Sequence, residues 1–563
     1  MVNRGRSGGC VTCKQRRVKC DEEKPKCQPC QRLGLLCGGY RTKCTKIKFK
    51  DQNHKFFTNA VQVQAQDQVP APRPLAEPEN AVSFFLGHYA SMGRDLDSAR
   101  GFFEILVPVY CSQPQNSALS LAVSAVASRI LSIWRYGPDS FQSPRETYTQ
   151  AITSLRSALQ DRVERSNPAT LLAALSLHLY ENIAAIYGLN SATRIHLDGA
   201  VSLLPFANVH QVNDMIGAYI RRYILHTEVS SAMRQKRSLR TIAYTWLRSK
   251  ELIGAPDNPS SALDAIGVSV AELQANYLQA VTQNSVVPLS QQNLEEWMAE
   301  AKYIDEQLLD WARNVPDYWQ PVKLISGQAI DPSIPTYRSV CEVYPTCQIA
   351  TIWNLWRVQR LLLVKIFFNS LYKILYGRHS ESTDDQILTE NRDIAECTRI
   401  LQELVDSVCY SVPFCLGNRT KPSSIADFTD PAILFPSDHI LFPENGNALN
   451  QQSHDLKMSR DEHRRHIVSQ GLWSIMSPLS CLMTFFLEDD RAMMAFLRPG
   501  QYEWIREQCL RVSVLLRIPS AASDDSNERH LVLNSSSAPV SVNNGVEQLV
   551  KRVRKGAIFM SGP

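Results

Sequence analysis

The sequence lacks a long apolar run. Its most apolar stretch, LLLVKIFF at 361–368, is interrupted by Lys365 and is too short to span a bilayer. The chain begins MVNRGRSGG, which has neither the apolar centre nor the cleavage site of a secretory leader. These two absences predict a soluble, intracellular protein with no membrane partner. In a reducing compartment, clustered cysteines are metal ligands more often than disulfides.

Motifs of the common enzyme classes are missing as well. The sequence has no Gly-x-Gly-x-x-Gly loop, Walker motif, nucleophile elbow or His-Glu-x-x-His helix. The run DEHRRH at 461–466 pairs two histidines but lacks a complete ligand set, and we interpret it as the exposed, charged start of a helix. His178, His196 and His226 lie in apolar helical contexts, which are typical of core or edge histidines. We therefore predict that the protein is not an enzyme.

Negative charge is scarce in the first part of the chain. Residues 1–50 contain 14 Lys and Arg against 3 Asp and Glu, whereas the other 513 residues contain 46 against 52. The balance is +11 for the first part and −6 for the rest. This asymmetry predicts a basic arm that binds a polyanion, attached to a neutral or acidic body.

Cysteine is sparse except in one short segment. Six of the 15 cysteines form two copies of the frame C-x2-C-x6-C, CVTCKQRRVKC at 10–20 and CQPCQRLGLLC at 27–37. Paired C-x2-C motifs at this range are a strong zinc signal. One tetrahedral zinc takes four thiolates and two separate zincs take eight, so six thiolates satisfy two ions only if two sulfurs bridge them. The repeat allows three symmetric bridging pairs: Cys10 with Cys27, Cys13 with Cys30, or Cys20 with Cys37.

The double frame resembles that of the fungal binuclear zinc cluster transcription factors, and all six cysteines match the family's pattern. The resemblance implies two Zn²⁺ ions bridged by Cys10 and Cys27. Cys13 and Cys20 complete one site in this assignment, and Cys30 and Cys37 complete the other.

The two copies differ in charge. The first carries four basic side chains between its cysteines, and the second carries only Arg32. We expect a short helix at the start of each copy. In the family that the sequence resembles, a helix of the first half enters the DNA major groove. Carried over, Arg17 lies where the family places its main base-reading residue, Arg16 and Lys19 flank it, and Lys14 points toward a phosphate. An arginine there can donate to O6 and N7 of guanine, which suits the family's CGG-type triplets.

A polar, proline-rich stretch follows the basic segment. VPAPRPLAEPEN at 69–80 has four prolines in twelve residues, which indicates a linker. Many members of the family dimerise through a heptad coiled coil at this point. This chain shows no heptads, and its prolines would break such a helix. A homodimer or heterodimer would therefore have to form through the region beyond the linker.

Helical patterns fill the region beyond residue 80. Between Leu119 and Ile133, apolar residues recur at spacings of four and three, which predicts one face of a helix. Pro144 and Pro168 each follow a capping residue and predict helix starts. Three other stretches, about 417–424, about 446–462 and 519–545, are expected to lack structure.

The helical region also resembles the regulatory region that follows the cluster in the same family. The matches are short patterns: RIHLDGAVSLL at 194–204, ATIWNLWRVQRLLL at 350–363 and WSIMSPLSCLM at 473–483. The predicted organisation is a two-zinc cluster domain at 1–43, a basic then Pro-rich linker at 44–80, and a large all-α regulatory region of stacked helical hairpins at 81–563.

The resemblance implies a nuclear regulator of RNA polymerase II genes that binds double-stranded DNA with CGG-type triplets and acts with transcriptional coregulators. The alternative is a zinc-organised RNA- or protein-interaction module without sequence-specific duplex binding. The basic bias of only the first half argues against that alternative.

Overall fold

The structure is a computed structural model in which the chain divides into two compact units, Met1–Ala76 and Glu77–Pro563. The predicted linker lies outside the described residues except for Asn80, and the stretch 519–545 lies outside them except for Pro519. The structure describes residues 9–24, 26–38, 80–91, 98–136, 144–191, 193–206, 215–248, 257–283, 289–325, 330–377, 384–438, 458–487, 491–519, 547 and 550–553.

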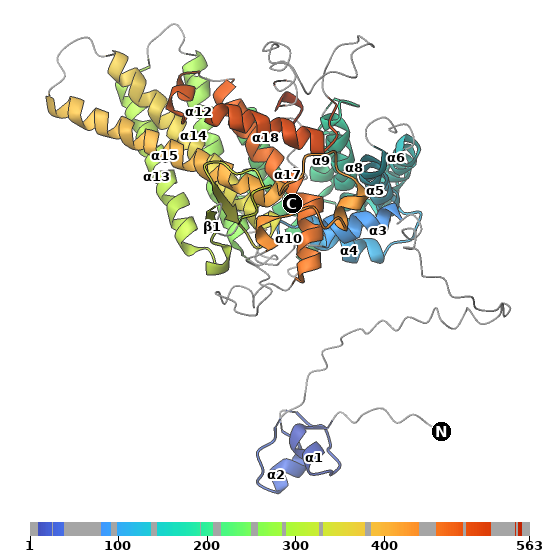
Figure 1. Ribbon diagram of the computed structural model, residues 1–563. Helices are drawn as coiled ribbons and strands as arrows, with labels where there is room; N and C mark the ends of the chain where they lie inside the picture. The colour runs from blue at the N-terminus through green and yellow to red at the C-terminus, as the bar shows by residue number, and fades with distance from the viewer. Residues whose placement is uncertain are drawn as a thin grey trace, which may run out of the picture. The chain divides into compact units, whose positions relative to one another are not determined.

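The first unit contains two short helices, α1 (Val11–Gln15) and α2 (Gln28–Arg32), shown in blue in Figure 1. Each follows an N-cap cysteine with extended backbone, Cys10 for α1 and Cys27 for α2. Among the described residues of this unit, the buried hydrophobic cluster consists of cysteines alone. Such a small unit has too little apolar surface to fold by burial, so its fold is expected to depend on metal.

The second unit is mostly helical. The helices up to residue 248 are α3 (Ala81–Phe85), η2 (Leu86–Ala90), α4 (Phe102–Cys111), α5 (Ala118–Tyr136), α6 (Pro144–Gln160), α7 (Arg162–Arg165), α8 (Pro168–Ile186), α9 (Ile195–Leu203), α10 (Met215–Gln235) and α11 (Thr241–Arg248). The helices beyond it are α12 (Pro259–Gln283), α13 (Gln291–Asn314), η5 (Asp317–Trp319), α14 (Cys347–Gly377), α15 (Asp384–Leu416), η6 (Ile425–Phe428), η7 (Pro436–Asp438), α17 (Arg460–Leu487), η8 (Arg491–Phe496) and α18 (Gln501–Leu515).

The helix starts follow local capping rules. Pro168 is the first residue of α8, and the Asn167 side chain accepts a hydrogen bond from the Ala169 N–H at 2.9 Å. Helix α6 begins at Pro144. Both starts confirm the sequence-based prediction, because proline fixes a helical φ and lacks an N–H that the first turn could not pair.

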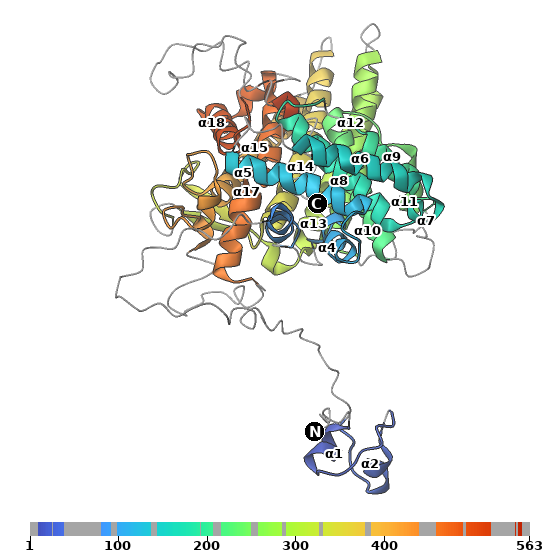
Figure 2. The same ribbon diagram turned by 90° about the vertical axis from the view of Figure 1, so that its right-hand side faces the viewer.

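Among the described residues of the second unit, the buried apolar side chains form one cluster. Within the described part of the chain, three helices, α5, α8 and α17, have the length and composition of a bilayer span, but 72%, 94% and 72% of their apolar windows are buried inside the protein. Their side chains are therefore accounted for by packing. In two views α6, α8 and α9 lie together, and α13, α14 and α15 pack side by side (Figure 1 and Figure 2).

The second unit also contains a hairpin that helical periodicity did not predict. Strand β1 (Val322–Ile325) pairs antiparallel with β2 (Val340–Val343), with Val322 opposite Val343. Glu342 of β2 is 1% exposed and accepts a hydrogen bond from Arg357 of α14 at 2.7 Å. The region is thus mostly helical, as expected, with one hairpin that a buried ion pair ties to α14.

The segment 417–424, which was expected to lack structure, is ordered. Arg419 is 4% exposed, and its guanidinium donates to the carbonyls of Cys415 and Val468 at 3.0 and 3.2 Å. Gly417 has φ +56°, and a Cβ there would lie 2.2 Å from the Leu434 carbonyl oxygen. The segment is polar in composition, yet the guanidinium of Arg419 is used inside the fold.

The start of α17 corrects a second expectation. The helix begins at Arg460, inside the stretch 446–462 that was expected to lack structure. His463 and His466 are both fully buried rather than exposed. His466 Nε2 accepts a hydrogen bond from the Cys347 N–H at 2.9 Å and so ties α17 to the start of α14. Both histidines therefore belong to the core and not to an exposed, charged helix start.

Candidate metal centre and nucleic-acid interface

The two cysteine frames of the first unit, 10–20 and 27–37, have the same backbone conformation around their helices. Arg17 (φ +58°) follows the C-cap of α1, and Gly34 (φ +63°) follows that of α2. In the first half, the N–H groups of Arg17 and Val18 donate to the carbonyls of Lys14 and Cys13. In the second half, Gly34 and Leu35 donate in the same way to Gln31 and Cys30. Both helices therefore end in a Schellman turn, in which a left-handed residue closes the last turn.

Six cysteine sulfurs converge between these helices. The Sγ atom of Cys27 lies 3.6 Å from those of Cys10 and Cys13 and 3.9 Å from that of Cys37. Cys30 Sγ lies 3.8 Å from Cys10 Sγ. A tetrahedral zinc with bonds of about 2.3 Å has sulfurs about 3.8 Å apart, so these spacings fit zinc.

The sulfurs form two groups of four, each with its ligand atoms within 4.8 Å of one another. The groups share two members, Cys10 and Cys27. This is the sharing that six thiolates need to satisfy two tetrahedral ions. One group is Cys10, Cys13, Cys20 and Cys27, and the other is Cys10, Cys27, Cys30 and Cys37.

Burial changes the protonation of the free thiols. Loss of hydration raises the pKa of Cys13 to about 12 and also raises the pKa of Cys27. Without metal these thiols keep their protons at neutral pH, and zinc binding must release them. No other group of His, Cys, Asp and Glu among the described residues meets the same distance criterion.

Two polar residues that the sequence reasoning missed tie the halves together. The Thr12 hydroxyl donates to the Leu36 carbonyl at 2.9 Å and accepts from the Gly38 N–H at 2.8 Å. The Asp21 carboxylate accepts from the Gln28 N–H at the start of α2, at 3.0 Å. Threonine and aspartate are common surface residues, so only their position inside the cysteine frame could have singled them out.

The four basic residues of the first half lie together at the end of α1. Lys14 is in the last turn of the helix, Arg16 is its C-cap, and Arg17 and Lys19 follow. All four are exposed. The basic residues predicted to extend this surface, Arg4, Arg6 and 41–50, lie outside the described residues.

The matching positions of the second half are not basic. They hold Gln31, Leu33, Gly34 and Leu36, and Leu33 and Leu36 are 58% and 88% exposed. The two halves therefore have matching backbones but differ in the charge of their exposed side chains.

The three histidines expected in the helical region are core or edge residues. His178 is buried, and its Nε2 lies 3.2 Å from Nδ2 of Asn182. His226 Nδ1 lies 2.8 Å from Asp264 Oδ1, and burial lowers the pKa of His226. His196 is half-buried, 3.2 Å from Glu181. Each contacts a neighbouring side chain, and their burial agrees with the prediction of core or edge histidines.

Two protein families match this chain. Residues 8–47 match the fungal Zn(2)-Cys(6) binuclear cluster domain, and residues 95–349 match the fungal specific transcription factor domain. No solved structure matches the chain.

Individual relatives are similar over different lengths. The aspercryptin biosynthesis cluster-specific transcription regulator atnN of Emericella nidulans is 62% identical over 37 residues, 6% of each chain. Arginine metabolism regulation protein II of Saccharomyces cerevisiae is 54% identical over 35 residues, 6% of this chain and 4% of that relative. Transcription factor dbaG of Emericella nidulans is 21% identical over 342 residues, 60% of this chain and 74% of the relative. The matches to atnN and to arginine metabolism regulation protein II thus span only a small part of those two relatives.

The matches agree with the geometry of the cysteine cluster. The cluster match contains all six converging cysteines, and the second match covers a large part of the helical unit. On these grounds the chain belongs to the fungal Zn(2)-Cys(6) binuclear cluster family of transcription factors.

Proposed function

We propose that this protein is a nuclear, sequence-specific DNA-binding regulator of RNA polymerase II transcription. The first half of its zinc cluster reads a CGG-type triplet in the major groove. One observation carries the proposal. The two halves of the cysteine cluster have matching backbones, but only the first half exposes four cations. If the charge served only solubility, nothing would favour one half over the other.

The proposed metal centre is two Zn²⁺ ions. Cys10 and Cys27 bridge both, Cys13 and Cys20 complete one site, and Cys30 and Cys37 complete the other. The two overlapping groups of sulfurs support this assignment. Six thiolates and two zincs add −6 and +4, so residues 1–50 keep a balance of +9 from their side-chain charge of +11. The bound metal therefore leaves the unit strongly attractive to phosphates.

The cations have separate proposed roles. Arg17 stands on the exposed turn after α1, where a guanidinium can donate to both O6 and N7 of guanine. Arg16 and Lys19 flank it, and Lys14, one turn back, contacts a phosphate. A phosphate contact contributes affinity without sequence preference, whereas a base contact contributes preference.

Residues 81–563 are proposed to carry regulation, through coregulators and through any dimer that forms. One triplet recurs about every 64 base pairs on one strand, so a second contact is needed to specify a gene among about 10⁶–10⁹ competing sites. The match of residues 95–349 to a transcription factor domain supports a regulatory role for this region.

The test is a competition experiment with the zinc-loaded full chain. Fluorescence anisotropy follows release of a labelled CGG duplex by unlabelled CGG duplex, scrambled duplex, single strand and RNA. We expect the CGG duplex to compete best, by tenfold or more. Equal competition by single strand or RNA would reject duplex reading and favour the interaction-module alternative.

A further inference from the structure

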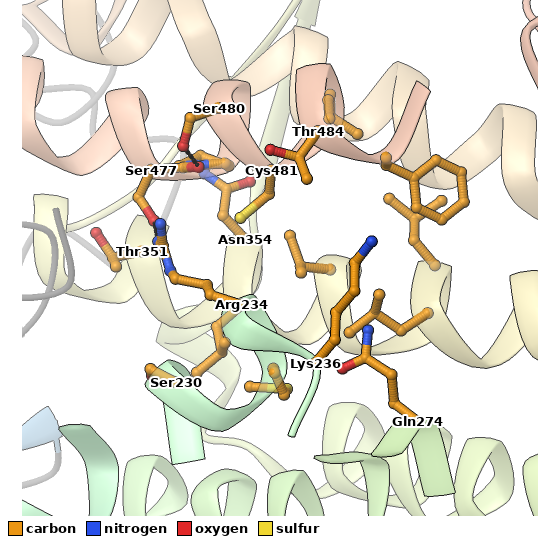
Figure 3. Close-up of a pocket in the computed structure, with 18 of the residues that line it drawn as sticks. Ser230, Arg234, Lys236, Gln274, Thr351, Asn354, Ser477, Ser480, Cys481 and Thr484 are labelled. Carbon is orange, nitrogen blue, oxygen red and sulfur yellow. Dashed lines mark hydrogen bonds between the residues drawn. The ribbon is translucent and has the colours of Figure 1, made fainter. Parts of the chain in front are cut away.

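The helical unit contains a cavity that the proposed DNA reading does not use. It lies among α10, α12, α14 and α17, four helices from different parts of the chain (Figure 3). Its empty space is about 1030 Å³, open solvent at its mouth included, and space for the centres of water molecules accounts for about 100 Å³. An apolar cavity of about 150 Å³ can bind benzene. This partly open cavity is therefore large enough for a molecule of one or two rings.

The cations of the lining are already engaged within the protein. Arg100 donates to Ser260 Oγ at 2.7 Å. Arg234 of α10 donates to the Ser477 hydroxyl of α17, and Arg234 and Lys236 also interact with other groups of the chain. Figure 3 shows the charged groups of Arg234 and Lys236 at opposite ends of the cavity. One charged group on a ligand could not meet both, so the lining gives no reason to expect an anion.

The lining does not suit a cationic ligand either. The described lining residues include no Asp or Glu. A cation would thus lose its hydration without gaining a carboxylate partner. The face of an aromatic ring, in contrast, is attracted to cations without bringing a charge of its own. The charges of the lining therefore favour a neutral molecule that contains an aromatic ring.

One wall of the cavity is apolar. Leu355, Val358 and Leu362 of α14 line it at spacings of three and four, which places them on one helix face. The lining also includes the thioether of Met233 of α10 and the ring of Phe485 of α17. Thioethers and rings both make favourable contacts with aromatic rings. The body of the ligand should therefore be apolar and aromatic.

One buried acceptor in the lining has no partner. Gln274 of α12 is 6% exposed, and its amide oxygen has no hydrogen-bond partner among the described residues. Figure 3 shows its amide group directed toward the space between the helices. A buried acceptor left unpaired is costly, so such groups in native proteins often mark a missing ligand or water. A hydroxyl or N–H group on a ligand can supply the donor.

We propose that this cavity binds a small neutral aromatic molecule of one or two rings that carries a hydroxyl or N–H donor. The ring lies against the α14 wall, and the donor meets the amide oxygen of Gln274. Phenols and indoles are the classes of compound with this chemistry. Such a ligand contacts helices from different parts of the chain, so its binding stabilises their packing.

The test uses the zinc-loaded full chain with indole as the probe and benzofuran as its matched control. Both are neutral bicyclic molecules of nearly the same shape, but benzofuran has an oxygen in place of the N–H donor. Calorimetry measures the affinity for each, and thermal unfolding measures stabilisation of the folded chain. We expect indole to bind at least threefold more tightly, because only indole can pair the Gln274 oxygen. Equal binding of the two, or binding of neither, overturns the proposal.

Two variants test the donor contact. Gln274→Met removes the amide with little change in size, so indole and benzofuran should bind equally to it. Gln279→Met, at an exposed glutamine of the same helix, should keep the difference between them. Thermal unfolding without a ligand shows whether each variant is folded. An indole advantage that survives in Gln274→Met, or that is lost in both variants, contradicts the contact.

The neutral character of the ligand has its own comparison. Indole-5-carboxylate keeps the N–H donor and adds one negative charge. We expect it to bind at least tenfold more weakly than indole, because its carboxylate loses hydration in the cavity without gaining a matched partner. Equal or tighter binding of the acid shows that the cavity selects an anion and overturns the proposed ligand class.

A last measurement locates the probe in the wild-type chain and needs no variant to fold. 5-Azidoindole keeps the N–H donor and crosslinks to nearby residues on illumination. Peptide mapping should find the label on the segments of α10, α12, α14 or α17 that line the cavity, and excess indole should prevent this labelling. Labelling confined to other segments, or labelling that excess indole does not prevent, places the probe elsewhere and rejects this cavity.

Discussion

The two halves of the cysteine cluster share a backbone and differ on their surfaces. In each, a cysteine N-cap starts a five-residue helix and a left-handed residue ends it, Arg17 in one and Gly34 in the other. One half exposes four cations, and the other exposes leucines at matching positions. Cysteine spacing and helix ends therefore set the shape, while the side chains between them can change with function.

The largest expected effect is a difference in zinc loss between a cysteine that bridges both ions and a cysteine that binds one ion. Cys27→Ala should lose more than one zinc per chain, because its sulfur belongs to both groups of four. Cys37→Ala should lose at most one, because its sulfur belongs to a single group. Structural zinc contributes about 10–16 kcal/mol of binding free energy in small domains, so loss of both ions should unfold the unit. Native mass spectrometry of fragment 1–50 counts the ions.

The same zinc count can contradict the assignment of two bridged ions. The wild-type fragment should carry two zincs. One zinc in the wild type, or equal loss from Cys27→Ala and Cys37→Ala, contradicts bridging by Cys27. Chelation should also abolish the folded unit, because its described buried cluster consists of cysteines alone.

The next effect compares the basic residues of the two halves. Arg17→Ala should remove about 1–3 kcal/mol of preference for CGG over a scrambled duplex, because it removes a bidentate contact to guanine. Arg32→Ala removes the same charge from the second half and should leave the preference intact. Anisotropy titrations of the full chain with both duplexes give the four affinities needed. A preference that survives Arg17→Ala shows that another residue reads the base.

A smaller effect tests the cost of placing an arginine in a left-handed turn. Glycine adopts φ +63° freely, whereas residues with a Cβ do so at a cost of about 1 kcal/mol. Nothing lies within 4 Å of a Cβ built on Gly34, so Gly34→Ala should suffer this cost without a clash. Arg17→Gly should relieve the strain and keep the cluster folded while it loses DNA preference.

Chelator competition compares these two variants. A change of about 1 kcal/mol in the free energy of folding alters zinc retention about fivefold. Zinc retention should fall in Gly34→Ala and should stay level or rise in Arg17→Gly. If Arg17→Gly loses zinc as readily as Gly34→Ala, the two turns are not equivalent, and the comparison between the halves fails.

The smallest effect concerns a phosphate contact. Lys14→Ala should weaken binding to all duplexes alike and lower the slope of log affinity against log salt by about one unit. Gln31→Ala changes the matching position of the second half and should leave the slope unchanged. Titrations at several salt concentrations measure both. A selective loss of CGG binding in Lys14→Ala would assign this lysine to a base instead.

Local rules predicted the parts of the molecule that depend on local chemistry. The cysteine frame identified the sulfurs that converge, because metal geometry restricts ligand spacing. Pro144 and Pro168 marked helix starts because proline is restricted by its own ring. The sequence could not show that Arg17 and Gly34 occupy matching turns. That equivalence rests on backbone hydrogen bonds and not on residue type.

Tertiary packing decided what sequence reasoning missed. The run DEHRRH is typical of a solvated helix start, but His463 and His466 are three residues apart and share the face of α17 that packs into the core. Composition likewise suggested disorder around Arg419, whose guanidinium is instead satisfied by carbonyls from two helices. Burial of polar groups depends on distant partners, which a local pattern cannot supply.

The hydroxyl of Thr12 has a mechanical consequence. Thr12 lies in α1, and its single oxygen holds both the Leu36 carbonyl and the Gly38 N–H, where the chain leaves the cluster. A pull on Gly38 is therefore transmitted through these two hydrogen bonds to α1, the helix proposed to read DNA. Thr12→Val, which keeps the shape and removes both bonds, would uncouple the tether from the helix. The helix proposed to read DNA and the point where the chain leaves the cluster are thus held together as one rigid piece.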